Sequence, residues 1–314
     1  MKSLSLALLA LVPLFAFAQN HAFVGNRFIV GDTAWFTTHI YNAATITAPG
    51  GSITKTSVDQ KLFHHQYTTS HIDTNSVVVT VYDSIQIVIT GDTSVVRFNS
   101  NNRADSAAAF HTLIYPLKAL IGHPLTAFVH GKSVIDSIRG LDAAIHDASL
   151  KLNRSAAIAA LKKAVNTDMV RDLMELTLAN LPNEEMSDDR SDKFKRTRTV
   201  GKTPFYDDVV TQLMRSTADT AWLVRFVYTQ LATPTFQYEG KACIIDSAYG
   251  AGDQQIVLDL PRGIVVASHE TFSNFLRAVI EKTNTSVIQI DELKTDVELV
   301  GYSKMDRKAT KKKK

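Results

Sequence analysis

The chain has 314 residues, of which 45% are apolar and 21% are charged, and its formal net charge is +3. It contains 14 Gly, 8 Pro and a single Cys. These values exclude a disordered protein, a collagen-like repeat and a small disulfide-stabilised domain. They are typical of a folded protein of one or two domains that buries a sizeable core.

Residues 1–18 have the three parts of a signal peptide. Lys2 is the only charged residue, residues 4–18 form an apolar run, and Ala16 and Ala18 supply the small residues of a cleavage site. The run is shorter than the ~20 apolar residues that span a bilayer. We therefore expect cleavage after Ala18, a periplasmic or extracellular protein, and no transmembrane segment in the mature chain.

The cysteine content and the charge distribution add two expectations. Cys243 lies in an apolar stretch, so it is expected to be a buried hydrophobic residue, and stability is expected to come from packing without disulfides. Residues 304–314 hold seven basic residues and one acidic residue. Without this tail and Lys2, the chain carries 26 basic and 30 acidic residues, so the folded body is mildly acidic. We interpret the tail as a disordered, solvated end, and we expect no specific nucleic-acid binding.

Residues 19–140 are expected to form an N-terminal β region with one helix. Runs rich in β-branched residues, such as 76–90, are separated by short polar turns, and no helical crossovers lie between them. The strands are therefore expected to be antiparallel. Apolar residues at helical spacing predict a helix near 105–121, which Pro116 is expected to kink or split, and a hairpin is expected over 125–138.

The second half of the chain divides into four parts. Residues 141–181 have helical periodicity, with Asn166 placed to cap a new helix. Residues 182–198 are dense in charge and are interpreted as an exposed loop. Residues 199–303 are expected to form a C-terminal β region, followed by the basic tail at 304–314. The predicted fold class is α+β: a β-rich antiparallel curved sheet or partial barrel with a helical insert in the middle.

No common catalytic or metal-binding motif is present in the sequence. G-x-S-x-G, H-E-x-x-H, the Walker loop, G-x-G-x-x-G and C-x-x-C are all missing. His64 and His65 would point to opposite faces of a strand, and His65 and His71 would lie about 20 Å apart. We interpret these as surface histidines and expect no metal site, no cofactor and no enzymatic activity.

A triplet of Asp, then Ser or Thr, then a small or apolar residue recurs along the chain. It is similar to the acceptor triplet for protein O-glycosylation in some exported bacterial proteins. The alternative is that Asp-Ser and Asp-Thr pairs favour turns and helix caps. The candidate acceptors are Thr33, Ser84, Ser106, Ser137, Thr220 and Ser247.

The order of these segments resembles an uncharacterised family of exported bacterial proteins of similar length, with a domain of unknown function. The resemblance is carried by the passage 120–125 (LIGHPL), by Gly140-Leu141-Asp142, and by Leu181-Pro182 ahead of Val200-Gly201. These motifs are structural, and the resemblance implies no catalytic residue.

Three functions remain open on the sequence. The first is a non-enzymatic protein that binds an apolar ligand or an envelope component, with one face of the strand 221–230 as the cavity wall; the alternative for that face is plain core. The second is a structural or interaction protein of the cell envelope. The third is a hydrolase with a dispersed site. The candidate wall residues are Trp222, Val224, Phe226 and Tyr228.

Overall fold

A computed structural model describes residues 21–73, 75–102, 111–131, 133–200, 203–231, 235–238, 241–280 and 283–304. The expected signal peptide, the candidate acceptor Ser106 and nearly all of the basic tail lie outside these residues. Within the described part of the chain, no helix combines the length and apolar character needed to cross a membrane.

The elements follow one another in a β–α–β order. The first part holds β1 (His21–Val24), β2 (Thr33–Thr47), β3 (Ile53–Ile72), β4 (Asn75–Thr90), β5 (Val95–Asn99), α1 (Tyr115–Lys118), β6 (Leu125–His130) and β7 (Val134–Arg139). The middle holds α2 (Leu141–Ser149), α3 (Ser155–Ala164) and α4 (Thr167–Leu178). The last part holds β8 (Glu184–Ser187), β9 (Ser191–Val200), β10 (Thr203–Ser216), β11 (Thr220–Leu231), β12 (Thr235–Tyr238), β13 (Lys241–Asp259), β14 (Ile264–Ile280) and β15 (Thr285–Ser303).

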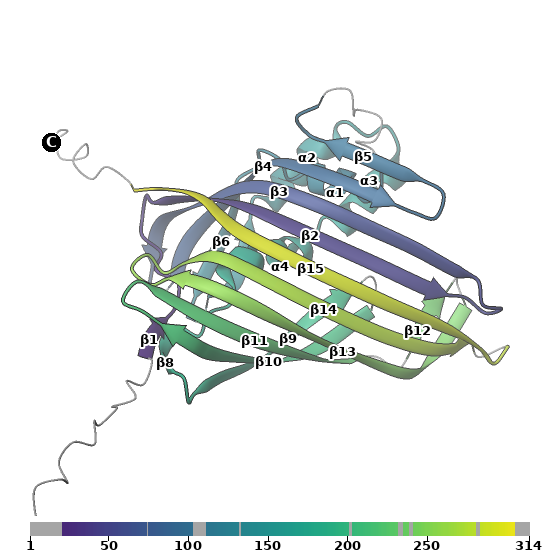
Figure 1. The fold of residues 1–314 in the computed structure, drawn as a ribbon. Helices are drawn as coiled ribbons and strands as arrows, with labels where there is room; N and C mark the ends of the chain where they lie inside the picture. The colour runs from purple at the N-terminus through teal and green to yellow at the C-terminus, as the bar shows by residue number, and fades with distance from the viewer. Residues whose placement is uncertain are drawn as a thin grey trace, which may run out of the picture.

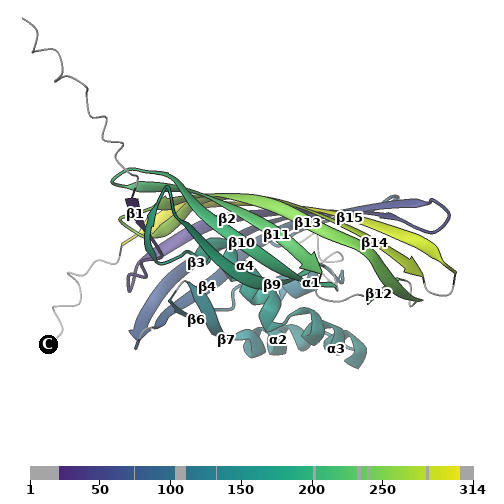
Figure 2. The ribbon, with the colours of Figure 1, turned by 90° about the horizontal axis from the view of Figure 1, so that it is seen from below.

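The predicted α+β class and the antiparallel curved sheet with helices in the middle of the chain are confirmed. One sheet of 13 strands runs in the order β7-β6-β4-β3-β2-β15-β14-β13-β11-β10-β9, with β5 on β4 and β12 on β13. Every named strand pair is antiparallel. The sheet is curved and unclosed, and the helices lie on its concave side (Figures 1 and 2).

The two β regions expected from the sequence join into a single sheet. The last strand, β15, pairs with β2 from Thr33↔Ser303 to Thr47↔Ile288. Register shifts interrupt several ladders, as at Asp246 in β13 and at Asp83 in β4, opposite Phe63/His64 of β3. Such bulges bend and twist the strand that carries them, which contributes to the curvature of the sheet.

Two expectations about local structure were wrong. The helix expected near 105–121 is a single turn, α1, with Pro116 in its first turn where a missing N–H is tolerated; residues 105–110 of the expected helix lie outside the described residues. The charged segment 182–198 is not a loop: it forms β8 and most of β9. Its charges alternate between faces, with Asp192 buried on the inner face and Lys193 exposed on the outer face, so charge density did not indicate a loop.

The helices form as the periodicity predicted. Asn166 caps α4, accepting a hydrogen bond from the N–H of Met169 at 2.8 Å. Val170, Met174 and Leu178 are four residues apart and buried, so they form the face of α4 that packs into the core. Cys243 is also buried, as expected.

Two apolar clusters hold the fold together. The larger one packs the four helices against β3, β4, β6 and β7, with Leu62, Ile85 and Leu125 almost fully buried. A second cluster lies where β1 and β8 meet β10, β11 and β13, and Leu213 and Leu258 are among its almost fully buried members. Burial of such side chains contributes roughly 1.5–3 kcal/mol each.

His64 is an unusual member of the interior. It lies on the inner face of β3 with 2% exposure, between Phe36 and Tyr82, whose ring centroids are 5.6 and 5.4 Å from its own. It is therefore not a surface histidine, although His65 does point to the opposite face as predicted. Burial, with a smaller contribution from His65, lowers the pKa of His64 to about 4.

We expect the substitution His64→Phe to remove part of the acid sensitivity of the fold. Between pH 6.5 and about 4 the unfolded chain protonates this histidine and the folded chain does not, so stability falls as the pH is lowered. The full effect is on the order of 3 kcal/mol. Chemical denaturation at pH 7 and pH 4.5 measures it, with exposed His71→Phe as the control. An equal pH dependence of wild type and His64→Phe would contradict this expectation.

Candidate functional site

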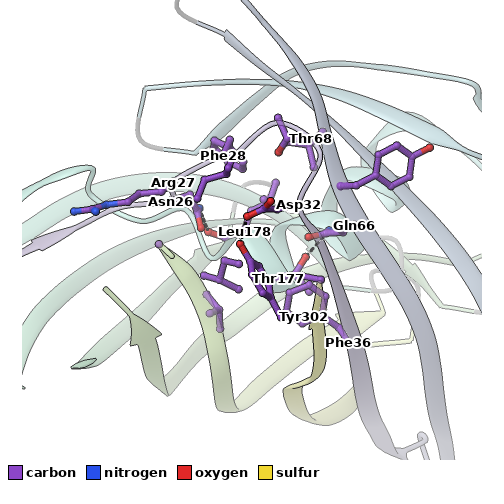
Figure 3. A pocket seen from close by; sticks show the side chains of 17 residues that line it. Asn26, Arg27, Phe28, Asp32, Phe36, Gln66, Thr68, Thr177, Leu178 and Tyr302 are labelled. Carbon is purple, nitrogen blue, oxygen red and sulfur yellow. Dashed lines mark hydrogen bonds between the residues drawn. The ribbon is translucent and has the colours of Figure 1, made fainter. Parts of the chain in front are cut away.

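Two hollows lie beside α4, and the smaller one lies where hydrogen bonds connect the helix to the sheet. It has a volume of about 60 Å³ and lies between the segment 26–32, β2, β3 and the end of α4 (Figure 3). The Gln66 amide donates to Thr177 Oγ1 at 2.7 Å, and the Asn26 amide donates to the Leu178 carbonyl at 2.7 Å. A space of this size holds about two water molecules, which is too small for an organic ligand. The hydrogen bonds around it anchor the end of α4 to β3 and to the segment 26–32.

The larger hollow is the candidate site. It has a volume of about 260 Å³ and lies between α4 and the inner face of β2, β15, β14, β13, β11 and β9. Its apolar lining consists of Ile40, Leu173, Leu176, Phe272 and Leu293. Its charged lining consists of Asp172, Glu175, Arg196, Arg225, Glu270 and Asp291.

The strand register explains how one cavity receives both kinds of side chain. Three rows of inner-face residues cross the sheet below α4, each row running perpendicular to the strands. The Arg225 row is polar and comprises Asp192, Thr211, Arg225, Gln254, Glu270 and Thr295. The Phe272 row is apolar and comprises Phe194, Val209, Val227, Gly252, Phe272 and Leu293. The Asn274 row is again polar and comprises Arg196, Asp207, Thr229, Gly250, Asn274 and Asp291.

Arg225 is a buried cation that joins this wall to the helix. Its side chain is 2% exposed. The guanidinium donates to Thr211 Oγ1 at 3.0 Å and to Gln254 Oε1 at 2.9 Å. It also donates to the carbonyls of Ala179 and Asn180, at 2.7 and 3.3 Å, where α4 ends. Burial, with the nearby Arg196, lowers the pKa of Arg225 to about 10, so it remains charged at neutral pH.

The backbone that receives Arg225 is strained. Ala179 and Asn180 have φ values of 54° and 42°, a left-handed conformation that costs alanine roughly 1–2 kcal/mol. Hydrogen bonds to a charged donor contribute about 1.5–3 kcal/mol. These hydrogen bonds are large enough to offset the strain, so Arg225 holds Ala179 and Asn180 in the left-handed conformation.

Arg196 spans the concave side of the sheet. Its Nε donates to Asp207 Oδ2 at 3.0 Å on the neighbouring strand, and its Nη2 lies 3.5 Å from Glu270 Oε1 on β14. β9 and β14 are separated by three strands in the sheet order, so curvature brings their side chains together. Burial disfavours the charged form, but Glu270 and Asp207 outweigh it and raise the pKa of Arg196.

Three carboxyl groups of the cavity hold protons more tightly than in water. Asp172 is exposed at its outer side, but desolvation by the surrounding protein raises its pKa to about 6, with a further contribution from Glu175 one turn away on α4. Burial also raises the pKa of Glu175, although a hydrogen bond with the Asn180 side chain opposes this. The pKa of Asp291 is raised by burial, against hydrogen bonds from Gln289 and Asn274. Burial is the largest cause of all three shifts in pKa.

The four residues proposed as a cavity wall lie on the opposite side of the sheet. Trp222, Val224, Phe226 and Tyr228 share one face of β11, as their alternation predicted, but α4 packs against the other face. Phe226 and Tyr228 are 37% and 56% exposed. Val224, Phe226 and Tyr228 line a groove of about 550 Å³ on the outer face, which is more open to solvent than the cavity below α4. The Arg215 guanidinium stacks 3.9 Å from the Trp222 ring centroid.

The candidate acceptor residues for glycosylation occupy different environments. Ser84 is only 8% exposed, and such burial of the residue is at odds with modification of the folded protein. Ser137 is exposed, and Thr33, Thr220 and Ser247 are partly exposed. For these four residues modification stays a prediction. Among the described residues, no group of three or more His, Cys, Asp or Glu side chains is arranged to hold a metal ion.

The sequence analysis did not identify the polar residues of the cavity. A signal was present: Asp192, Phe194 and Arg196 alternate with Lys193 and Lys195, and Arg225 interrupts an apolar strand face. Charged residues at a spacing of two within strands indicate a polar sheet face. The curvature that brings those faces below one helix has no local signature.

The comparison with protein families found a match for the middle of the chain. Residues 73–195 match the model of a family of unknown function (DUF6263). The match runs from the turn before β4 through the four helices into β9, and it covers less than half of the chain. It is consistent with the predicted resemblance to an uncharacterised family with a domain of unknown function. A search of curated proteins found no match.

The comparison with solved structures concerns the fold. The chain is similar to one from a structure of lipid–protein interactions in lipovitellin, with 9% identity and a TM-score of 0.51. The alignment covers 88% of this chain and 26% of that one, so the chain spans about a quarter of the lipovitellin chain. An outer membrane channel from Pseudomonas putida F1 has 8% identity, covers 87% of this chain and 97% of its own, and has a TM-score of 0.21, too low to inform the fold.

We expect the substitution Arg225→Met to destabilise the protein strongly. It leaves the carbonyls of Ala179 and Asn180 and the side chain of Gln254 without their donor, and loss of one partner from such a buried network costs about 3 kcal/mol. The exposed Arg277→Met on the outer face of β14 is the control, with an expected change below ~1 kcal/mol. Urea denaturation measures both. Equal effects of the two substitutions would contradict the structural role given to Arg225.

Proposed function

We propose that the protein is a non-enzymatic binding protein that holds a single-chain amphiphile in the cavity between α4 and the concave face of the sheet. The observation that carries this proposal is the composition of the cavity wall. An apolar row lies between two buried polar rows, so one space accommodates both a hydrocarbon chain and a polar group.

The size of the cavity supports a small ligand. Sites for organic ligands are typically about 300–1,000 Å³ and predominantly apolar, with a few polar groups that orient the ligand. At about 260 Å³ the cavity lies just below this range, which favours one hydrocarbon chain over a lipid with several. Leu173 and Leu176 cover the cavity from α4, and Phe272 and Leu293 form its floor.

The similarity to lipovitellin supports the same kind of function. That structure concerns lipid–protein interactions, and the fold similarity extends over 88% of this chain despite 9% sequence identity. A curved sheet with helices on its concave side provides an interior in which an apolar group is sheltered from water.

The proposal places the protein outside the cytoplasm, on the strength of the signal peptide expected over residues 1–18. Periplasmic or extracellular fluid is aqueous, so an apolar compound there needs a carrier to remain dispersed. N-terminal sequencing of the protein from the periplasmic or secreted fraction tests the location, and we expect the mature chain to begin at Gln19. Recovery of the intact chain from the cytoplasm alone would contradict it.

A hydrolase is the second candidate function. Asp172 and Glu175 lie one turn apart on α4, both line the cavity, and the pKa of Asp172 is raised to about 6. A carboxyl group with a raised pKa beside a second carboxyl group is the arrangement of a general acid with a base. Turnover of a bound compound that is lost in Asp172→Asn would favour this function over binding alone.

Native mass spectrometry of the purified mature protein tests the binding function. We expect a co-purified small molecule, released by denaturation, in the wild type. Leu293→Trp fills the cavity and should remove the bound mass, whereas Ile290→Trp on the outer face of the same strand should retain it. Wild-type protein that carries no ligand and binds none of the ten-carbon probes described below would refute the proposal.

A further inference from the structure

The charges around the cavity restrict the kind of polar group that a bound amphiphile carries, and this inference rests on the proposed function. Six acidic residues belong to the polar rows or to the α4 side of the cavity: Asp172, Glu175, Asp192, Asp207, Glu270 and Asp291. Arg196 and Arg225 are the two basic residues in the same set. The wall therefore has more negative than positive groups.

Both arginines are already engaged by the protein. Arg196 is paired with Asp207 at 3.0 Å and with Glu270 at 3.5 Å. Arg225 donates to two side chains and two backbone carbonyls. An anionic ligand group would have to displace these internal acceptors, so the arginines are not available as a ready anion site.

An acceptor without a donor lies at the Asn274 row. Asn274 is 2% exposed, and its Oδ1 has no hydrogen-bond partner among the described residues. Its amide nitrogen lies 3.4 Å from Asp291 Oδ2, and the two residues are directly paired across β14 and β15. A buried acceptor without a donor is unfavourable, and an N–H donor from a ligand would satisfy it.

Small residues flank Asn274 and Asp291 in their row across the sheet. Gly250 lies beside Asn274 in the row, and Ala44 lies beyond Asp291. A Cβ added to Gly250 would be 2.8 Å from Phe272 Cζ and 3.2 Å from Asn274 Oδ1. The glycine thus allows the phenylalanine and the amide to lie close to the backbone of β13. Within the Asn274–Asp291 pair, Asp291 is the residue that lines the cavity.

We propose that the cavity selects an amphiphile with a cationic nitrogen, such as a primary alkylamine. Its N–H groups donate to Asn274 Oδ1 and to the carboxylate of Asp291, which has lone pairs beyond those bonded by Gln289. The carboxylate of Asp172, on the opposite wall, balances the charge. The hydrocarbon chain lies along Leu173, Leu176, Phe272 and Leu293.

Three probes of equal chain length test the charge preference directly. Decylamine, decanol and decanoate differ in the head group and share the ten-carbon chain. We expect isothermal titration calorimetry on the full mature chain to show decylamine binding at least tenfold more tightly than the other two. A charge-assisted hydrogen bond in a shielded site is worth about this factor.

Matched variants on one strand localise the effect. Asp291→Asn keeps the shape of the side chain and removes its charge, and it should weaken decylamine binding about tenfold while leaving decanol binding unchanged. Glu292→Gln removes a charge from the neighbouring, exposed position on the outer face and should leave all three affinities unchanged. Thermal unfolding of both variants verifies that they are folded.

The pH dependence provides a second readout that does not require a variant of a buried residue. Asp172 faces Glu175, Asp168 and Arg171 on its own helix and Arg196 from β9. Ionisation of Asp172 near pH 6 adds a negative charge to the wall, so decylamine affinity should rise severalfold from pH 5 to pH 7.5. Asp172→Asn should flatten this rise.

The outcomes separate the two proposals. Equal binding of the three probes, or tighter binding of decanoate, overturns the charge preference and leaves an amphiphile-binding cavity in place. Binding of none of the probes overturns both. Preference for decylamine that persists unchanged in both Asp291→Asn and Asp172→Asn overturns the assignment to these residues.

Discussion

The contact between Arg225 and the end of α4 is the interaction on which the interior arrangement depends. The guanidinium comes from the middle of the sheet, and the carbonyls of Ala179 and Asn180 come from a helix that covers the concave side. Because these two residues adopt a left-handed backbone, the helix ends abruptly above the sheet. The hydrogen bonds therefore set the position of α4, and the space beneath the helix follows from that position.

The buried polar rows are expensive to maintain, and this bears on their role. Replacing a buried charged network by apolar residues of similar volume is often neutral or stabilising in proteins. The clusters at both ends of the sheet show that this sequence readily builds an apolar interior. Arg225 is needed to position α4, but the Arg225 and Asn274 rows hold further buried polar residues, such as Glu270 and Asp291, on either side of an apolar row. This arrangement is consistent with a binding surface.

Much of the fold followed from local patterns. Alternation predicted the strands and their antiparallel arrangement, and periodicity with the Asn166 cap predicted α3 and α4. The charged segment 182–198 was misjudged because its charges were counted as a group, whereas their alternation is what a strand with a polar inner face requires. The length of the helix expected near 105–121 was overestimated. Pro116 is tolerated in the first turn of a helix, and α1 begins there, which apolar spacing alone does not show.

The sequence by itself determined which side chains share a face. Side chains of a strand alternate, so Trp222, Phe226 and Tyr228 had to lie opposite Arg225 and Val227 whatever the fold. Tertiary structure alone decided which of those faces is concave, because that depends on the side against which α4 packs and on the bulges that curve the sheet. These are long-range relations: β15 must pair with β2 before Ile40, Asp291 and Asp172 border one space.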